Sequence, residues 1–176
     1  MATVTLDKVH SSVAFQVKHM MVSKAKGEFH DFDVEVSGDV QDLENASVKA
    51  TIQVDSIDTN NEDRNGHLKS GDFFDTENYP TITLNSKSVK KVSDSEYEVT
   101  ADVTIKGVTN EETFKVEANG VAKDPMGGNM VAGFDVEGSV NREDYGLTWN
   151  APLETGGVLI GKDVKLQAAF EFVIEE

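Results

Sequence analysis

A charged insert between two stretches of alternating residues most constrains the fold of this chain. Apolar residues alternate with mostly polar ones on both sides of it, at Val48, Ala50, Ile52, Val54, Ile82 and Leu84. A period of two is typical of strands that bury one face. The insert, residues 56–86, contains a charged patch with helical character and returns through Tyr79-Pro80. The sequence therefore predicts a break in a β-structure that can close the mouth of a barrel.

The same alternation recurs along the rest of the chain. The other alternating stretches lie at Val13–Val17, Phe32–Val36, Val99–Ile105, Phe114–Val116, Phe134–Val140 and Leu166–Phe172. Short strands at fairly even spacing are typical of a sandwich or barrel and not of βαβ units. We therefore expect an all-β fold, an antiparallel barrel of about eight strands that has few exposed edges and room for one small ligand.

Turn residues and glycines refine this expectation. Residues 106–110, Lys-Gly-Val-Thr-Asn, predict the turn of a hairpin. Gly120, Gly133 and Gly138 lie within or beside strands, where glycine marks either a cavity wall or a bulge or bend. In the insert we expect a helix over residues 62–70, with Asn60 or Asn61 as its cap, and a short turn around residues 75–78.

Composition sets independent limits. A length of 176 residues suits one domain, residues 1–176, with a sizeable core. The net charge of −16 disfavours binding to nucleic acid or to an anionic membrane surface, and the chain contains no concentrated basic patch. No apolar run is long enough to cross a bilayer, so we expect no stable membrane insertion.

The start of the chain bears on its location. Residues 1–12 lack a basic stretch followed by an apolar core of the length that a secretory signal requires. We therefore expect a cytoplasmic protein if Met1 is the native start. An exported protein is expected if a signal peptide has been removed.

Signatures of catalytic and metal sites are missing from the sequence. There is no cysteine, no GxSxG motif and no P-loop. The four histidines are His10, His19, His30 and His67, and no two of them are three to five residues apart. We therefore predict no catalytic residue, no metal and no cofactor other than a bound lipid.

The insert carries the polar groups with the clearest alternative interpretations. In a helix, Asp63 shares a face with His67, and Arg64 shares one with Leu68. In a structural interpretation, Arg64 pairs with an acid at 72 or 75 and His67 caps or packs under the loop. In a functional interpretation, Arg64 and His67 hold the polar head of a ligand, because a guanidinium suits phosphate or carboxylate.

Several motifs in this order resemble those of one family. They are Leu6-Asp7-x-x-His10-Ser11, Phe15-x-Val17-x-His19, Gly27-x-Phe29-x-x-Phe32, residues 63–75 (DRNGHLKSGDFFD), Gly107-Val108-Thr109, Asn141-Arg142-x-Asp144-Tyr145-Gly146-Leu147 and Gly161-x-Asp163-Val164. Together they resemble the YceI-like family across nearly the whole chain. Asn65 departs from the pattern, because the family more often carries an acid after the arginine. The resemblance implies a lipocalin-like antiparallel barrel that holds a long isoprenoid or fatty-acyl amphiphile, and a possible homodimer.

The resemblance also guides the prediction of a site. His19 falls on the apolar face of its strand, so it is either a satisfied core group or a polar contact inside a pocket. We predict that the ligand's head group contacts His19, Arg64 and His67. We predict that its tail contacts Phe15, Val17, Ile52, Val103, Phe134 and Phe170, each of which is equally compatible with an ordinary core position.

Three functions follow from this site. The first is binding, carriage or sequestration of an isoprenoid or fatty-acyl amphiphile. The second is an enzyme for a lipid-like or quinone substrate, in which His19 or His67 is the acid or base and Arg64 stabilises negative charge. The third is a structural or interaction protein with a filled interior. The first would show a co-purifying lipid, the second turnover that depends on these side chains, and the third neither.

Overall fold

The computed structural model describes residues 3–20, 22–150 and 159–175. Their strands are β1 (Thr3–Leu6), β2 (Ser12–His19), β3 (Ser23–Phe29), β4 (Phe32–Ser37), β5 (Ser47–Gln53), β6 (Ile57–Asp58), β7 (Thr81–Lys91), β8 (Glu96–Ile105), β9 (Val108–Lys123), β10 (Met130–Asn141) and β11 (Ile160–Glu175). The helix α1 spans Glu62–Lys69, and three 3₁₀ turns span Leu43–Asn45, Val54–Ser56 and Arg142–Tyr145.

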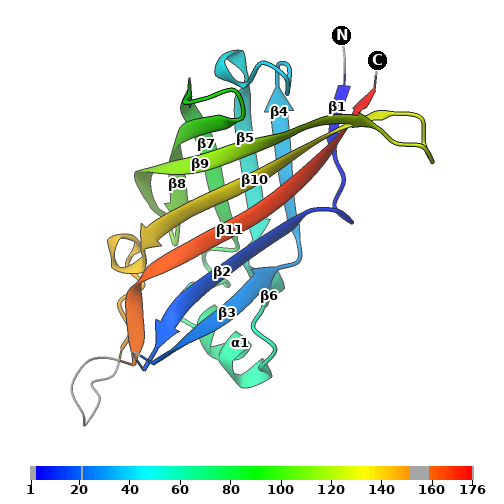
Figure 1. Ribbon diagram of the computed structural model, residues 1–176. Coiled ribbons are helices and arrows are strands. Elements are labelled where there is room, and N and C mark those ends of the chain that lie inside the picture. Colours follow the sequence, from blue (N-terminus) through cyan, green and yellow to red (C-terminus); the bar gives the residue numbers. More distant parts are fainter. Residues whose placement is uncertain (1–2, 21, 151–158, 176) are drawn as a thin grey trace.

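All pairs of neighbouring strands are antiparallel, and together they form one curled sheet (Figure 1). The order is β4-β5-β7-β8-β9-β10-β11-β2-β3-β6, and β1 pairs with the outer part of β11. The ends of this path, β4 and β6, are not paired with each other, so the sheet is a half-barrel in its hydrogen bonding. β1 and the end of β11 lie at one end of the half-barrel and α1 lies at the other (Figure 1).

The all-β antiparallel fold is confirmed, and the strand count is higher than expected, since eleven strands are present among the described residues. The additional strands are β1, β3 and β6. β1 and β6 are four and two residues long, too short for an alternating pattern to stand out. β3 carries lysines at 24 and 26, and its inward positions include Gly27, which contributes no apolar side chain to the pattern.

The turn between β8 and β9 is tighter than the sequence predicted. Lys106 and Gly107 both have positive φ, 51° and 76°, and Ile105 pairs with Val108. Two residues with positive φ form the turn whose twist matches that of a hairpin. Thr109 and Asn110, which we expected in the turn, therefore belong to β9.

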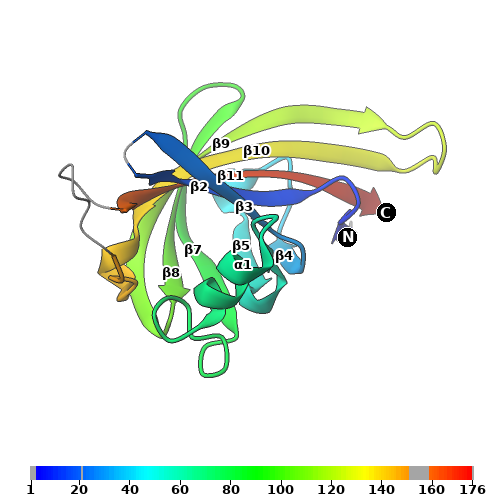
Figure 2. The same ribbon diagram turned by 90° about the horizontal axis from the view of Figure 1, so that it is seen from below.

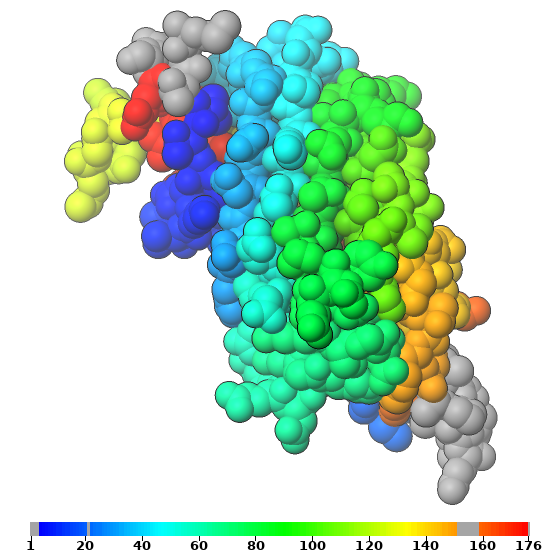
Figure 3. Space-filling view, turned by 180° about the vertical axis from the view of Figure 1, so that it is seen from behind, coloured from blue at the N-terminus to red at the C-terminus, as the bar shows by residue number. Residues whose placement is uncertain are grey.

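Two of the glycines in strands mark a bulge. Ala132 pairs with Val121, but Phe134 pairs with Ala118, so β9 has one extra residue there. Gly120, with φ of 97°, is in this extra stretch, and Gly133 lies opposite it. Beyond the bulge, the β9–β10 hairpin projects from the body of the molecule (Figure 3).

The insert connects two strands that are neighbours in the sheet. Gln53 at the end of β5 pairs with Thr81 at the start of β7, so the 27 residues from 54 to 80 leave and rejoin the sheet at the same end. Within them α1 spans Glu62–Lys69 and is capped by Asn61, whose side chain accepts a hydrogen bond from the Arg64 N–H at 3.0 Å. The predicted helix and its cap are confirmed. α1 lies across the lower end of the half-barrel (Figure 2).

At the end of the half-barrel where α1 lies, backbone hydrogen bonds join the two residues between β3 and β4 to Ser56 and Gln53. The His30 N–H donates to the Ser56 carbonyl at 3.3 Å, and the Gln53 N–H donates to the Asp31 carbonyl at 2.9 Å. These bonds extend the β3–β6 and β4–β5 pairings by one residue each into the bend between β3 and β4. They tie this bend to the end of β5 and to the residue before β6.

A buried arginine fixes the corner between β10 and β11. Arg142 is 6% exposed and donates hydrogen bonds to the carbonyl oxygens of Leu147 at 2.6 Å, Gly161 at 2.8 Å and Trp149 at 3.0 Å. Burial lowers the pKa of this guanidinium. The fully buried Tyr145 follows in the same turn, and its hydroxyl donates to Glu112 on β9 at 3.0 Å.

No helix among residues 3–20, 22–150 and 159–175 has the length and apolar character needed to cross a membrane.

We predict that Gly138→Ala lowers the free energy of unfolding by about 1–3 kcal/mol, the usual cost of inserting a methyl group into a packed core. A Cβ at Gly138 would lie 2.4 Å from the ring of Phe114, which is 3% exposed, so the ring must move. Gly133→Ala is the matched control on the same strand, because its Cβ would lie at least 3.8 Å from any neighbour. Chemical denaturation measures both; equal effects would contradict the role of Phe114.

A second prediction concerns alkaline pH. Burial, and then the hydrogen bond to Glu112, raise the pKa of Tyr145 far above its ordinary value of about 10. Since its folded pKa is raised, the stability from this phenol is complete below about pH 10 and is lost as pH rises beyond it. Tyr145→Phe should therefore lower stability at pH 8 by about 1 kcal/mol and flatten its decline between about pH 10 and 11.5. Urea denaturation across this range tests it; parallel curves would contradict it.

Candidate functional site

The inward faces of the sheet enclose a cavity of about 610 Å³. Side chains from β2, β4, β5, β7, β8, β9, β10 and β11 line it, and almost all of them are apolar. The curl of the sheet makes its inner face concave, and the side chains on that face do not fill the interior. This volume lies in the range of about 300–1,000 Å³ that is usual for small-molecule sites.

All six residues predicted to contact a ligand tail line this cavity: Phe15, Val17, Ile52, Val103, Phe134 and Phe170. Val103 and Phe134 are buried, and the other four are half-buried; of these, Phe15, Ile52 and Phe170 pack against the core. Aromatic rings contact one another along the wall, for example Phe32 and Phe170 with centroids 6.1 Å apart. Contact between these residues and a ligand stays a prediction.

The three predicted head-group residues also line the cavity, toward the end that α1 covers. Polar groups there come from the end of β2 and from the insert, and we name this region the polar end; it comprises Lys18, His19, Asn61, Asp63, Arg64 and His67. An apolar cavity with its polar groups at one end matches an amphiphile, which has an apolar tail and a polar head.

Thr59 holds Arg64 in place. The Arg64 Nε donates to the Thr59 hydroxyl at 2.9 Å, and its Nη2 donates to the Thr59 carbonyl at 2.6 Å. Thr59 is 5% exposed and lines the cavity beside Arg64. Arg64 therefore does not pair with an acid at 72 or 75, as the structural interpretation proposed, and no ion pair to Arg64 occurs within the described ranges. Its orientation is fixed while its charge is left without a counter-ion.

Asn65 completes this arrangement through its amide. Its Oδ1 accepts hydrogen bonds from the Thr59 N–H at 2.8 Å and the Thr59 hydroxyl at 2.6 Å, and its Nδ2 donates to Asp58 at 3.3 Å. The N–H of Asn60, followed by this amide, lowers the pKa of Asp58. An acid at position 65 could not donate to Asp58 when ionised. The amide of Asn65 therefore serves Thr59 as an acceptor and Asp58 as a donor at the same time.

His67 is held by contacts within the insert and by Trp149 from the corner between β10 and β11. Its Nε2 lies 3.0 Å from an Asp72 carboxylate oxygen, and its ring packs edge-on against Phe73 and Trp149, with centroids 5.0 and 4.7 Å away. These contacts fit the structural interpretation, in which His67 packs under the loop. A role toward a ligand stays a prediction.

His19 differs from His67 in its surroundings. It is the last residue of β2, is half-buried, and lines the cavity. Within the described part of the chain its imidazole has no hydrogen-bond partner, and only its backbone pairs, with Ser23 and Ile160. His19 therefore has both ring nitrogens available at the polar end.

The charged side chains around the cavity are mostly cationic, whereas the protein as a whole is anionic. Of the six charged residues in the described ranges that line or border it, Lys18, Lys26, Arg64 and Arg142 are cationic and Asp33 and Asp63 are anionic. None of these cations forms an ion pair with another described residue. A protein with a net charge of −16 thus has a cationic excess at its cavity.

Sequence reasoning assigned no role to three residues that shape this site. Thr59 orients Arg64, Arg142 ties the corner that carries Trp149, and Trp149 packs on His67 and on Phe73. Arg142 belongs to the motif at residues 141–147 that resembles the family, and this motif could have identified it. A lone threonine and the chain's single tryptophan carried no periodic signal that could have identified them.

Comparisons with known proteins agree with this architecture. The family described as YceI-like domain matches residues 4–172. A UPF0312 protein of Staphylococcus aureus strain MSSA476 is 54% identical over 176 residues, 100% of both chains.

Solved structures share the fold. The YceI protein of Campylobacter jejuni is 31% identical with a TM-score of 0.77, covering 98% of both chains. BcnA of Burkholderia cenocepacia is 24% identical with a TM-score of 0.79, covering 94% of this chain and 98% of its own. A polyisoprenoid binding domain from Saccharophagus degradans, implicated in plant cell wall breakdown, is 14% identical with a TM-score of 0.72, covering 99% of this chain and 100% of its own. The extent of the family match and the 54% identity over a full-length relative show that this chain belongs to the YceI-like domain family.

Proposed function

We propose that this protein binds one amphiphile with a long isoprenoid or fatty-acyl tail and an anionic head. The observation that carries the proposal is the cavity of about 610 Å³, whose wall is apolar except at one end. The tail would lie among the six predicted wall residues, and the head would lie at the polar end beside Arg64. Carriage and sequestration both require this binding step.

Apolar burial alone can supply the affinity. Each methylene group removed from water contributes about 0.8 kcal/mol, so a tail of about twenty carbons gives roughly 16 kcal/mol before ordering costs. The polar groups then set the orientation and the selectivity of binding. This division suits a cavity whose polar groups are few and gathered at one end.

The cationic excess supports an anionic head. Arg64 has two of its nitrogen atoms bonded to Thr59 and has no acidic partner in the part of the chain that the structure describes. A guanidinium that is already oriented loses little entropy when it binds a carboxylate or phosphate. The proposal therefore assigns the ligand a negative charge, which would offset that of Arg64.

The name of one structural neighbour fits the proposal. The Saccharophagus degradans domain is described as polyisoprenoid binding, and its fold is shared. At 14% identity this likeness concerns the fold, so the choice of ligand here rests on the cavity and its charges.

The enzymatic alternative stays a prediction. Of its two candidate bases, His67 is engaged by Asp72, whereas His19 has free ring nitrogens among the described residues. The homodimer, the cytoplasmic or exported location and the single-domain organisation also stay predictions.

The proposal is tested by filling the cavity. Native mass spectrometry of wild-type protein should show one bound molecule of palmitate or geranylgeranyl diphosphate. Val103→Trp, on the inner face of β8, should weaken this binding on the order of fifty-fold if it excludes about three methylene groups. Glu98→Trp adds the same side chain on the exposed face of β8 and should leave binding unchanged.

Circular dichroism must show that both variants fold, and Val17→Phe replaces Val103→Trp if the latter does not. Two outcomes contradict the proposal. In one, neither probe binds the wild-type protein; in the other, the inward and outward substitutions weaken binding equally.

The head-group assignment has its own test. Arg64→Met should weaken binding of palmitate about tenfold or more and affect hexadecanol much less, because only the carboxylate of palmitate carries a charge that pairs with the guanidinium. Lys69→Met is the control on the same helix, since Lys69 pairs with Asp55 and does not line the cavity. Displacement of a fluorescent fatty acid measures both ligands. Equal losses for palmitate and hexadecanol would show that Arg64 only supports the fold.

A further inference from the structure

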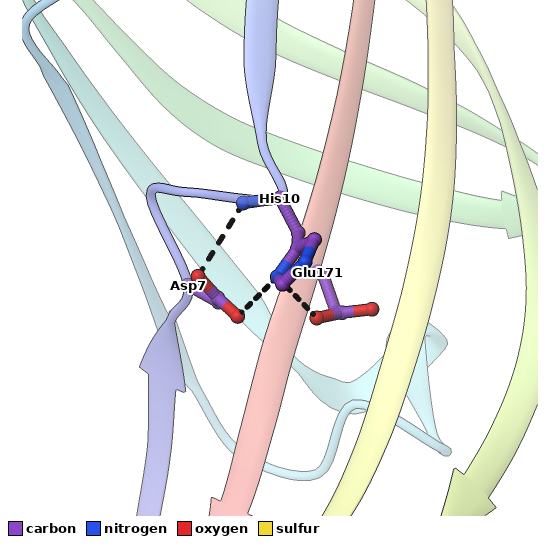
Figure 4. Close-up of side chains that lie close together, drawn as sticks. All are labelled: Asp7, His10 and Glu171. Atoms are coloured by element: carbon purple, nitrogen blue, oxygen red, sulfur yellow. Dashed lines mark hydrogen bonds and ion pairs between the residues drawn. The ribbon is translucent and has the colours of Figure 1, made fainter. Parts of the chain in front are cut away.

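A second cluster of polar side chains lies on the outer surface of the half-barrel, away from the cavity. It consists of Asp7, His10 and Glu171 (Figure 4). Glu171 lies on β11 between Phe170 and Phe172, both of which line the cavity, so its own side chain points outward. Asp7 and His10 belong to the connection between β1 and β2. The proposed amphiphile site uses none of these residues.

Three potential ligand atoms converge in this cluster. The His10 Nδ1 lies 2.8 Å from Asp7 Oδ2 and 3.4 Å from Glu171 Oε2. All three atoms lie within 4.8 Å of one another. At metal–ligand distances of 2.0–2.1 Å, neighbouring ligand atoms of a tetrahedral zinc site are separated by about 3.3 Å. The observed separations at Nδ1 lie on either side of that value, so a small adjustment of side chains would place an ion among them.

The backbone holds these residues in register. The Asp7 N–H donates to the Glu171 carbonyl at 2.8 Å, and the Glu171 N–H donates to the Ser11 hydroxyl at 3.1 Å. The Ser11 hydroxyl in turn donates to the Asp7 carbonyl at 2.6 Å. The two carboxylates and the imidazole are therefore brought together by the fold before any ion binds, which reduces the ordering cost of binding.

The two oxygens of Asp7 have different tasks. Oδ1 accepts the N–H groups of Val9 at 3.0 Å and His10 at 3.4 Å, which fixes the orientation of the carboxylate. Oδ2 is left to face the imidazole (Figure 4). A carboxylate whose second oxygen is hydrogen-bonded in this way has the supported geometry that metal sites require. Asp124 adds a further negative charge near His10.

We propose that Asp7, His10 and Glu171 form a binding site for a divalent transition-metal ion, with Zn²⁺ the first to test. One imidazole nitrogen and two carboxylate oxygens are ligands that zinc accepts, and water would complete the coordination. Mg²⁺ and Ca²⁺ prefer sites made entirely of oxygen atoms, so the imidazole disfavours them. A bound ion would link the β1–β2 connection to β11 and stabilise the folded protein, because the three ligands come together only when it is folded.

His30 provides a matched contrast within the same chain. It also lies between two acids, but Asp58 is 3.3 Å from Nε2 and Glu28 is 4.0 Å from Nδ1. These acids therefore face opposite nitrogens of the ring and cannot share one ion with it. Unlike the acids around His30, the two carboxylates at His10 approach a single nitrogen atom.

The experiment uses the full chain without an affinity tag, stripped of metal with a chelator. Isothermal titration with Zn²⁺ should show one saturable site, and Zn²⁺ should raise the melting temperature while Mg²⁺ and Ca²⁺ at the same concentration do not. Glu171→Gln and His10→Gln should each weaken Zn²⁺ binding about tenfold or more, a difference of about 1.4 kcal/mol. His30→Gln should leave it unchanged. Circular dichroism without metal checks that all three variants fold.

A proton on His10 Nδ1 accounts for the same close contacts, and the titration distinguishes the two possibilities. If Zn²⁺ shows no saturable binding, the cluster holds only a proton and the proposal is wrong. It is also wrong if His10→Gln and Glu171→Gln bind Zn²⁺ as tightly as the wild type, or if His30→Gln weakens binding as much as they do. Equal stabilisation by Ca²⁺ would show a general attraction of cations to an acidic surface and would likewise overturn it.

Discussion

The two-sided pleat of a curled antiparallel sheet is the constraint on which the rest of this structure depends. Successive residues of a strand point to opposite faces, so curling the sheet places every second side chain inside. In this protein the inward side chains are mainly valine, isoleucine and phenylalanine, and they leave about 610 Å³ unfilled. The same pleat sends Glu171 outward between two inward phenylalanines. The apolar cavity and the polar outer cluster are thus consequences of one geometric rule.

The chemistry at the covered end of the cavity depends on a local network in the insert. Thr59 is nearly inaccessible to solvent, and its hydroxyl and carbonyl both serve Arg64 while its N–H serves Asn65. Two side chains of α1 are thereby attached to the residue that follows β6. An exposed guanidinium on a short helix would otherwise sample many rotamers. Here its position relative to the cavity wall is determined by hydrogen bonds that do not involve a ligand.

The sequence predicted the structure well where the pattern is local, above all where apolar residues recur with the two-residue period of a strand. The eight strands with clear alternation, the α1 cap at Asn61 and all the inward positions chosen for the tail follow from local pattern. β6 could not be predicted in this way, since two residues contain no period. β3 alternates lysine with small or apolar residues, and its strand character depends on pairing with β2, which is a tertiary effect.

The site shows the same division between local and long-range information. The resemblance selected His19, Arg64 and His67, but the partners of Arg64 and His67 were beyond the reach of spacing. Asp72 and the single tryptophan meet His67 from different parts of the chain, and Arg142 binds four carbonyl oxygens that lie up to nineteen residues away. Every residue has a backbone carbonyl, so no pattern of residue types in the sequence identifies these acceptors.

The unpaired edges of the half-barrel have a consequence for how a long molecule could reach the interior. β1 lies beside β4, yet no ladder joins them among the described residues, whereas consecutive strands of the path from β4 to β6 are joined by backbone hydrogen bonds. Separating β1 from β4 therefore exposes apolar side chains but breaks no ladder hydrogen bond. Lateral opening along this seam therefore costs less backbone hydrogen bonding than parting any two paired strands of the sheet. A ligand with a long tail could enter the cavity through this seam, from the side of the barrel, without passing the polar groups beneath α1.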